Sequence, residues 1–402
     1  MNAIPRVPRG YSGPALFSYG FRPFFLAGSA WAAITVLLWV PQYFGGFTLT
    51  TIYAPHDWHI HEMLYGYVGA VIAGFLLTAI PNWTGRLPVA GVPLSILFVL
   101  WLAGRVAVLI STTIGATLAA VVDLAFLIVL SGVALREIVA GSNWRNLRIL
   151  IVLAVFIAGN IVFHIETSVS GTANYATRIG IASAIALIML IGGRIVPSFT
   201  HNYLLRTAGG REPGRLPHPF SRFDAISIAI CGIALAAWIA APSSIVAGWL
   251  LLLAGAMNVI RLARWAGDRT VADRLVLALH VGYSFVPIGF LLTALASLRP
   301  DIVSPSAGAH AWTVGAIGVM TLAVMTRATL GHTGRTLVAS HATEALFALG
   351  VVAASARIAA SFGAMEFWLN VSALAWIAAF LGFVFVYGPL LACHSRTASR
   401  EC

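Results

Sequence analysis

Charge is scarce in this sequence, and lysine is absent from it. Charged residues fill 9% of the 402 positions, whereas apolar residues fill 59%. A soluble domain of this length needs far more charge to cover its surface, so the composition excludes a soluble globular protein. Short runs of alternating apolar and polar residues are also missing, which argues against a transmembrane barrel. No C-x-x-C-H motif occurs, so any haem is expected to bind without thioether bonds.

Apolar runs of about twenty residues recur along the whole chain, and each is long enough to cross a hydrocarbon core of ~30 Å. The sequence therefore predicts an all-α polytopic membrane protein with about twelve transmembrane helices, in which residues 1–402 form a single integral membrane domain. The predicted spans are 22–41, 59–80, 92–110, 114–135, 146–168, 175–200, 222–241, 243–264, 276–298, 308–330, 340–360 and 367–393.

Arginine supplies all 24 basic residues, and its placement predicts the topology. Most arginines lie before the first span, after the last span or in links that follow even-numbered spans, with Arg178 and Arg299 as exceptions. Because cytoplasmic links carry the excess of positive charge, both termini are predicted to be cytoplasmic. The net charge of +11 is therefore interpreted as a topology signal and not as a nucleic-acid-binding surface.

An internal repeat is suggested by segment 61–86, which aligns without gaps to segment 310–335. The polar matches are His61 with His310 and a Thr-Gly-Arg triplet that ends both segments. The sixth span matches more weakly, with Thr177 in place of the histidine. These matches predict three pseudo-repeated four-helix units, at about 17–135, 146–264 and 276–393. Chance similarity within a biased composition is the alternative.

Several histidines are predicted to lie at the outer ends of their spans. Those considered as metal ligands are His56, His59, His61 and His310. His59 and His61 point in nearly opposite directions on a regular helix, so one helix cannot give both to one metal ion. Imidazole suits iron, copper and zinc. His61 and His310, equivalent in the repeat, could supply axial ligands to a haem in a central pocket. For each histidine, interfacial packing is the alternative.

Three further charged residues are predicted to lie inside the membrane, where an ionised side chain usually faces a partner or a cavity. Arg105 and Arg357 fall in the outer halves of two spans and could hold the two carboxylates of a haem. The alternative is that both arginines extend to the outer headgroups. Asp123 could pair with either arginine or belong to a proton path.

A second group of histidines is predicted at the inner ends of the spans. His201, His280 and His332 could form another metal or ligand site. The alternative is ordinary helix termination, because Pro197 and two nearby glycines interrupt the helices at this level.

Several sequence blocks resemble the NnrS family, bacterial membrane proteins linked to the nitric-oxide response and to denitrification. They are GFRPFFLAG, WHIHEMLYGY, GFLLTAIPNWTGR, GGRIVPSFTHNYL and RATLGHTGR. The resemblance extends from about residue 17 to residue 390. It implies a twelve-span protein of the bacterial inner membrane that contains haem b and copper. It carries ligand candidacy to His59, His61 and His310, and more weakly to His56.

Twelve spans in a threefold arrangement are also similar to the catalytic subunits of haem-copper oxidases and nitric-oxide reductases. This sequence departs from that pattern, because its sixth span has Thr177 at the repeat-equivalent position and no paired histidines follow its seventh span. A copper centre with three histidines, and hence oxygen reduction, is not expected.

These observations favour a haem and copper protein that binds or detoxifies nitric oxide, with a redox partner if electrons are needed. The sequence does not decide whether nitric oxide is turned over. A transporter of metal ions or small anions, using intramembrane histidine and arginine, is the alternative of another class. A protein that binds haem for delivery to another complex is a third.

Overall fold

The computed structural model describes residues 11–393. Within this range all regular elements are helical, and twelve helices are long and apolar enough to cross a membrane. An apolar helix suits a bilayer because it satisfies its backbone hydrogen bonds internally. The prediction of an all-α polytopic membrane protein with twelve spans is therefore confirmed.

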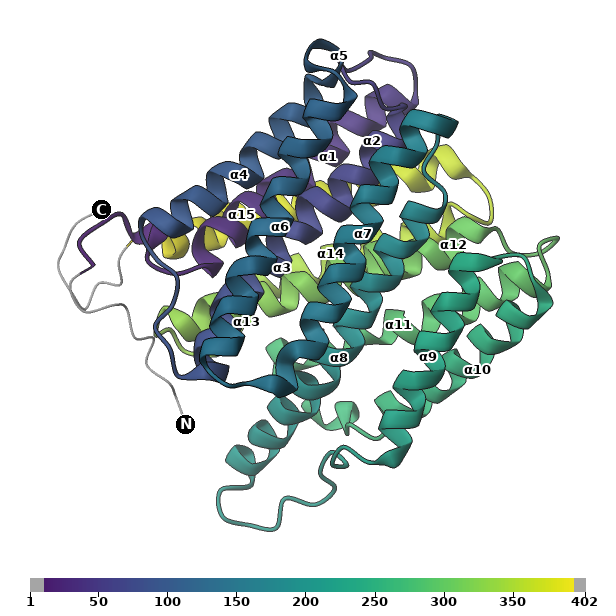
Figure 1. Cartoon of the computed structure of the whole chain (residues 1–402). Helices are drawn as coiled ribbons and strands as arrows, with labels where there is room; N and C mark the ends of the chain where they lie inside the picture. Colours follow the sequence, from purple (N-terminus) through teal and green to yellow (C-terminus); the bar gives the residue numbers. More distant parts are fainter. Residues whose placement is uncertain (1–10, 394–402) are drawn as a thin grey trace. The chain divides into compact units, whose positions relative to one another are not determined.

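The described residues form two compact units (Figure 1). The first contains residues 11–180, 325–336 and 380–393, and the second contains residues 181–324 and 337–379. The α-helices wholly within the first unit are α1 (Phe21–Tyr43), α2 (Pro55–His61), α3 (Gly69–Thr84), α4 (Val92–Leu109), α5 (Ser111–Ile114), α6 (Ala116–Ala140) and α7 (Leu147–Ser170). Its short 3-10 segments are η1 (Ala15–Phe17) and η3 (Trp144–Asn146).

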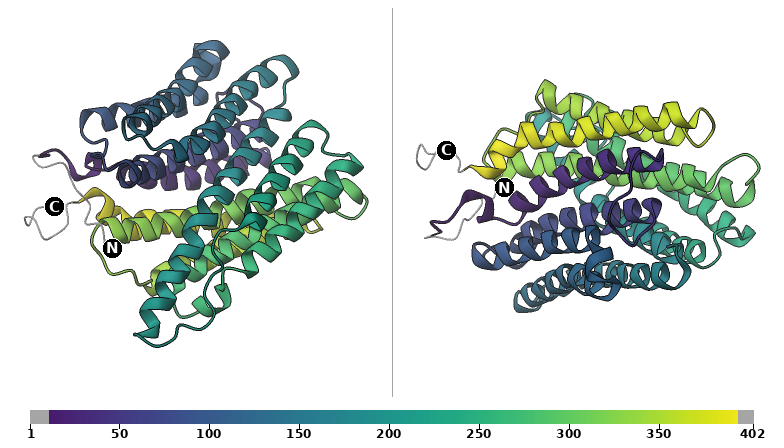
Figure 2. Two further views of the ribbon diagram at one scale, coloured as in Figure 1. Left: turned by 60° about the horizontal axis from the view of Figure 1, so that its bottom comes forward. Right: turned by 90° about the horizontal axis from the view of Figure 1, so that it is seen from above.

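The second unit is built around pairs of consecutive helices, of which α9 and α10 pack together as a hairpin (Figure 2). The helices wholly within it are α9 (Arg222–Ala240), α10 (Ile245–Ala263), α11 (Arg274–Leu298), α12 (Pro305–His310) and α14 (His341–Ala359), with a 3-10 segment η4 (Gly267–Thr270). Three helices contribute residues to both units: α8 (Tyr175–Ala208), α13 (Met320–His332) and α15 (Met365–Ala392).

Helix boundaries follow local capping signals that are visible in the sequence. Ser221 and Asp224 form a reciprocal capping box at the start of α9. Asp273 and Ser340 accept backbone N–H groups at the starts of α11 and α14. The main difference from the predicted spans is α8, whose 34 residues extend to Ala208. At 1.5 Å per residue it measures about 51 Å, so it extends beyond the hydrocarbon layer.

Two spans are interrupted by π-helical segments, which regular helical spacing does not predict. Segment η2 (Glu62–Val68) follows His61 directly, and η5 (Ala311–Val319) follows His310 directly. The two segments aligned in the repeat therefore share the same irregularity at the same register. The corresponding part of α8 is regular α-helix. The threefold repeat stays a prediction.

Candidate metal centre

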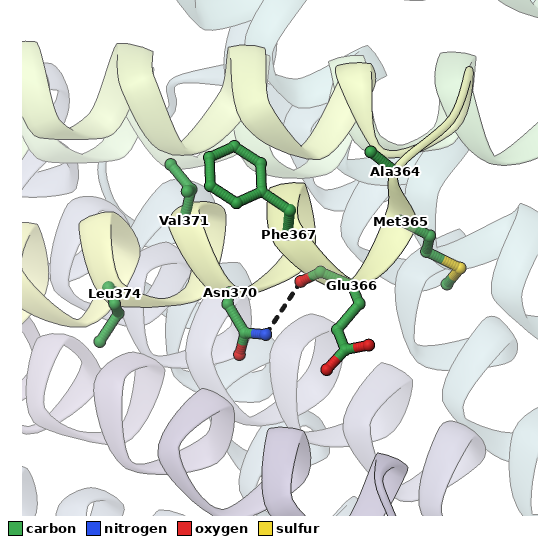
Figure 3. A pocket seen from close by; sticks show the side chains of 7 residues that line it. All are labelled: Ala364, Met365, Glu366, Phe367, Asn370, Val371 and Leu374. Carbon is green, nitrogen blue, oxygen red and sulfur yellow. Dashed lines mark hydrogen bonds between the residues drawn. The ribbon is translucent and has the colours of Figure 1, made fainter.

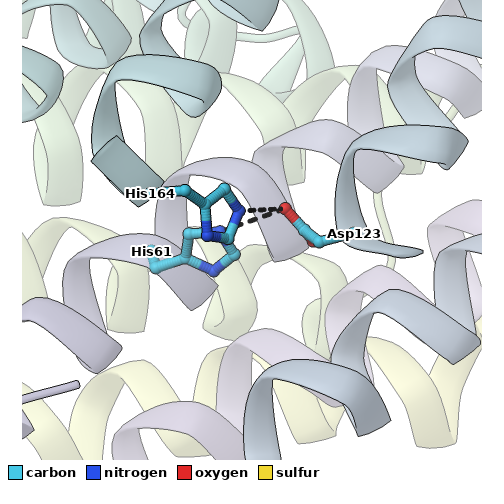
Figure 4. A group of neighbouring side chains, drawn as sticks. All are labelled: His61, Asp123 and His164. Carbon is cyan, nitrogen blue, oxygen red and sulfur yellow. Dashed lines mark hydrogen bonds and ion pairs between the residues drawn. The ribbon is translucent and has the colours of Figure 1, made fainter. Parts of the chain in front are cut away.

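Three helices of the first unit bring two imidazoles and one carboxylate together (Figure 4). His61 is the last residue of α2, Asp123 lies in α6 and His164 lies in α7. The Nε2 atoms of His61 and His164 lie 3.2 and 3.1 Å from the same oxygen, Oδ2 of Asp123. One ligand atom from each residue lies within 4.8 Å of the other two, and all three residues are buried.

Helix α7 contributes a second polar side chain to this group, one turn before His164. Asn160 donates from Nδ2 to Asp123 Oδ2 at 2.7 Å, and its Oδ1 lies 3.1 Å from His61 Nε2. Residues four positions apart lie on one face of a helix, so Asn160 and His164 face the same neighbours. The pair fixes the position of the Asp123 carboxylate from one side.

The π-helical segment η2 begins at Glu62 and directs this carboxylate back into the cluster. Oε1 of Glu62 lies 3.0 Å from His61 Nδ1. Its other oxygen accepts hydrogen bonds from Trp31 Nε1 at 2.6 Å and from Arg105 Nη1 at 2.7 Å. π-Bulges occur frequently at functional sites, where they change the direction of side chains within a helix.

Arg105 lies between the two carboxylates of the cluster and forms ion pairs with both. One guanidinium nitrogen binds Glu62 and the other binds Asp123. The side chain is only 2% exposed, so these pairs are shielded from water. The third donor, Nε, is buried and has no hydrogen-bond partner among the described residues. The sequence hypothesis that Asp123 pairs with one of the intramembrane arginines is confirmed.

Tyr53, in the loop before α2, completes the cluster. The hydroxyl of Tyr53 lies 2.8 Å from Nδ1 of His164, and its ring lies parallel to that of His61. The loop is held by Thr51 and Ile52, which hydrogen-bond to the Ser111 hydroxyl. Burial raises the pKa of the Tyr53 phenol, Asp123 and Glu62 raise it further, and Arg105 lowers it.

The side chain of His61 is surrounded by hydrogen-bond acceptors. Its Nδ1 faces a Glu62 oxygen, and its Nε2 faces oxygens of Asp123 and Asn160. Rotating the Asn160 amide would only move the conflict, because its oxygen would then face the Asp123 carboxylate. A neutral imidazole has a single N–H and cannot satisfy both sides. With both carboxylates ionised, as their ion pairs with Arg105 indicate, the site requires a positive charge at His61, from a second proton or from a metal ion.

The donor set suits a metal ion. Copper, iron and zinc all accept imidazole nitrogen and carboxylate oxygen. Bonds of about 2.0–2.2 Å place neighbouring ligand atoms roughly 3–3.5 Å apart, similar to the separations around Asp123 Oδ2. The outward nitrogens of both histidines already have partners, Glu62 for His61 and Tyr53 for His164. Such outer contacts orient metal-binding imidazoles.

The other predicted site residues lie outside the group of His61, Asp123 and His164. His56 is exposed and lies 3.8 Å from Asp57, whereas His59 stacks on Trp39 with ring centroids 4.2 Å apart. The three-donor group found in the described residues contains neither of them. His310 and Arg357 are partly buried residues of the second unit. Nδ1 of His310 lies 2.7 Å from the Ser306 carbonyl oxygen.

The inner-level histidines also fall into both units. Nε2 of His280 lies 2.8 Å from the Thr200 hydroxyl in the second unit. His332, in the first unit, packs against the rings of Tyr19 and Phe21. A metal or ligand site at this level stays a prediction.

Four members of the cluster are not among the predicted site residues: Tyr53, Glu62, Asn160 and His164. A signal for two of them was present, because Asn160 and His164 are polar residues four positions apart inside a predicted span. No comparable signal marked Tyr53, which reaches the site from a loop.

A shallow groove follows the first turns of α15 in the second unit (Figure 3). Its polar side chains are Glu366 and Asn370, and Asn370 donates to the Glu366 carbonyl oxygen at 2.9 Å. The groove is open and mainly apolar and has no imidazole or thiol among its lining residues. The buried cluster in the first unit is therefore the better candidate for a metal centre.

Comparison with known proteins identifies the family of this chain. No curated protein matches the chain. The model of the family described as NnrS protein matches residues 15–394, nearly the whole chain. This family is associated with haem and metal binding, and membership in it fits a general role in the nitric-oxide response. The chain therefore belongs to the NnrS family.

Proposed function

We propose that this protein is a haem b and copper protein of the bacterial inner membrane that binds or detoxifies nitric oxide during nitric-oxide stress. The observation that carries the proposal is the buried group of His61, Asp123 and His164. Buried charged and metal-binding groups inside a membrane segment are costly and usually functional. Family membership supports the same role.

The copper ion is proposed to bind at this group. Two imidazole nitrogens and a carboxylate oxygen fit copper, and the acceptor-rich surroundings of His61 favour a cation there. Bound copper would supply an open coordination position for a diatomic ligand. The chain's own contribution is to fix the donors: Asn160 holds Asp123, while Glu62 and Tyr53 hold the two imidazoles.

His310 is proposed as a residue that would hold the haem through its imidazole. Its Nδ1 donates to the Ser306 carbonyl, which places the lone pair on Nε2, the form in which imidazole binds a metal. His61 keeps its predicted candidacy for haem, and His56 and His59 keep theirs for metal. Arg357 is proposed to contact a haem propionate, because it offers a guanidinium within a membrane span. The contact of Arg105 with a propionate stays a prediction, because both of its Nη atoms already pair with Glu62 and Asp123.

Nitric oxide is a small neutral gas, so it is expected to reach the site by partitioning from lipid without a polar channel. Large apolar side chains are exposed on helices of both units, including Ile151, Val169 and Leu374. In a bilayer these side chains contact lipid tails. Electrons for any reduction are proposed to come from a redox partner.

The proposal is tested by optical spectra of the detergent-purified protein, oxidised, reduced and reduced with nitric oxide, together with metal analysis. We expect a b-type haem band that shifts with nitric oxide, and about one copper per chain. His310→Ala should remove the haem band, whereas His218→Ala, in an exposed loop, should not change it. A colourless, metal-free preparation from haem-replete cells would refute the proposal and favour transport.

A further inference from the structure

The buried cluster of the first unit contains an unequal number of opposite charges. Asp123 and Glu62 each contribute a carboxylate, and Arg105 contributes the guanidinium that pairs with both. All three side chains are at most 2% exposed. Imidazoles that bind a metal ion are neutral. Two carboxylates and one guanidinium then leave the side chains of this cluster with one net negative charge.

Neighbouring charged groups are engaged elsewhere. Asp57, one turn before His61 in α2, accepts the backbone N–H of Ala173. Glu166, near the end of α7, accepts the N–H groups of Tyr175 and Ala176 at the start of α8. Neither carboxylate forms an ion pair with Arg105 among the described residues, so the ion pairs of the cluster itself contain two carboxylates and one guanidinium.

The second unit contains a buried arginine whose surroundings have no excess of carboxylates. Arg261 pairs with the buried carboxylate of Asp224, which also pairs with Arg264, and it donates to the Tyr283 hydroxyl at 2.9 Å. Tyr283 donates to Asn258, which in turn donates to the Cys231 sulfur. Every polar side chain in this network has a hydrogen-bond partner. An excess of acceptors, as found at His61, is absent from this network.

We infer that Arg105 and Glu62 select the exogenous ligand of the copper centre by charge: a small monoanion when copper is divalent, and a neutral gas when it is monovalent. This inference rests on the proposed function. The cluster has one net negative charge. A divalent ion bound to it therefore keeps one uncompensated positive charge, and a monovalent ion keeps none. A net charge inside a bilayer is costly, so the neutral assembly is favoured in each state.

Arg105 and Glu62 therefore have opposite effects on the affinity of the divalent copper centre for an anion. Arg105→Gln removes the positive charge, so a divalent ion is already neutralised and gains little from an anion. Glu62→Gln removes a negative charge, so a divalent ion binds an anion more tightly. One unit charge a few ångströms from the ligand is expected to change affinity at least about tenfold.

The test uses the purified chain with its copper content measured first. Azide is titrated into the oxidised protein as the monoanion and followed by the electron paramagnetic resonance signal of divalent copper. Carbon monoxide is titrated into the reduced protein as the neutral gas and followed by the infrared stretch of the carbonyl bound to copper, so that binding to haem iron is not counted. We expect the azide Kd to rise at least about tenfold in Arg105→Gln and to fall at least about tenfold in Glu62→Gln. Carbon monoxide affinity should change much less.

Two controls separate local charge from other effects. Arg105→Lys keeps the charge and loses the forked geometry, so it should retain azide binding better than Arg105→Gln. Arg299→Gln removes the same charge from an exposed loop and should change nothing. If Arg105→Gln fails to fold, the fall of the azide Kd expected in Glu62→Gln still tests the inference. Copper-loaded variants with unchanged azide affinity would overturn the inference alone, whereas a copper-free wild-type protein would overturn the proposed function.

Discussion

His61 and His164 direct their Nε2 atoms at the same oxygen of Asp123, from 3.2 and 3.1 Å, although they belong to different helices. Each imidazole has its other nitrogen in contact with a second side chain, Glu62 for His61 and Tyr53 for His164. The two rings are therefore fixed at both nitrogens, and a metal ion that replaces the contacts to Asp123 would find its donors already oriented.

Removal of any one donor is expected to empty the metal centre. His61→Ala, Asp123→Ala and His164→Ala should each lower nonhaem metal content at least about tenfold, because two remaining donors hold a metal ion weakly. The measurement is metal analysis of purified protein. His218→Ala, in an exposed loop, is the control. Metal loss in His56→Ala equal to that in the three donor variants would assign the site to the predicted outer histidine cluster instead.

Tyr53→Phe is expected to weaken metal binding while keeping the fold. The substitution retains the ring that packs beside His61 and removes only the 2.8 Å contact to His164 Nδ1. Loss of an outer partner of this type typically costs about 10–100-fold in metal affinity. Competition with a chelator measures it, and Tyr43→Phe, at an exposed position, serves as the control. Unchanged affinity in Tyr53→Phe would show that the loop does not orient His164.

Gly66→Ala is expected to destabilise the first unit by about 1–3 kcal/mol. An added Cβ would lie 2.6 Å from Arg105 Nη1 and 2.8 Å from Glu62 Oε2, so the ion pair would have to move. Thermal unfolding in detergent gives the loss. Gly132→Ala is matched, because it lies in helix α6 with nothing within 4 Å of the new atom. That variant should be neutral or slightly stabilising, and a similar loss in both would point to a general intolerance of alanine.

The predicted orientation in the membrane is tested with single cysteines. Thr172 lies in the loop before α8, and His218 lies in the arginine-rich segment after it. In a background without Cys393 and Cys402, a membrane-impermeant maleimide should label Thr172→Cys in intact spheroplasts. It should label His218→Cys only after lysis, because positively charged links stay cytoplasmic. The reverse pattern would invert the topology. The terminal segments 1–10 and 394–402, on which the cytoplasmic ends were predicted, lie outside the described residues.

The sequence alone determined the class of protein and the number of spans. Composition and run length are enough for this, because a bilayer demands helices of a minimum length with few charges. The boundaries of α8 were less well predicted, since a helix that continues beyond the lipid no longer needs apolar residues. The sequence also identified His61, Arg105 and Asp123 as unusual intramembrane residues.

Only the tertiary structure decided which of these residues meet. The neighbours of His61 come from α6 and α7, and no periodicity in one helix specifies the contacts of another. The π-helical turn at Glu62 could not be anticipated from regular helical spacing, and it places this carboxylate between His61 and Arg105. The loop that brings Tyr53 to His164 is set by packing against Ser111. The sequence therefore supplied the chemical groups, and the packing of separate helices supplied their arrangement.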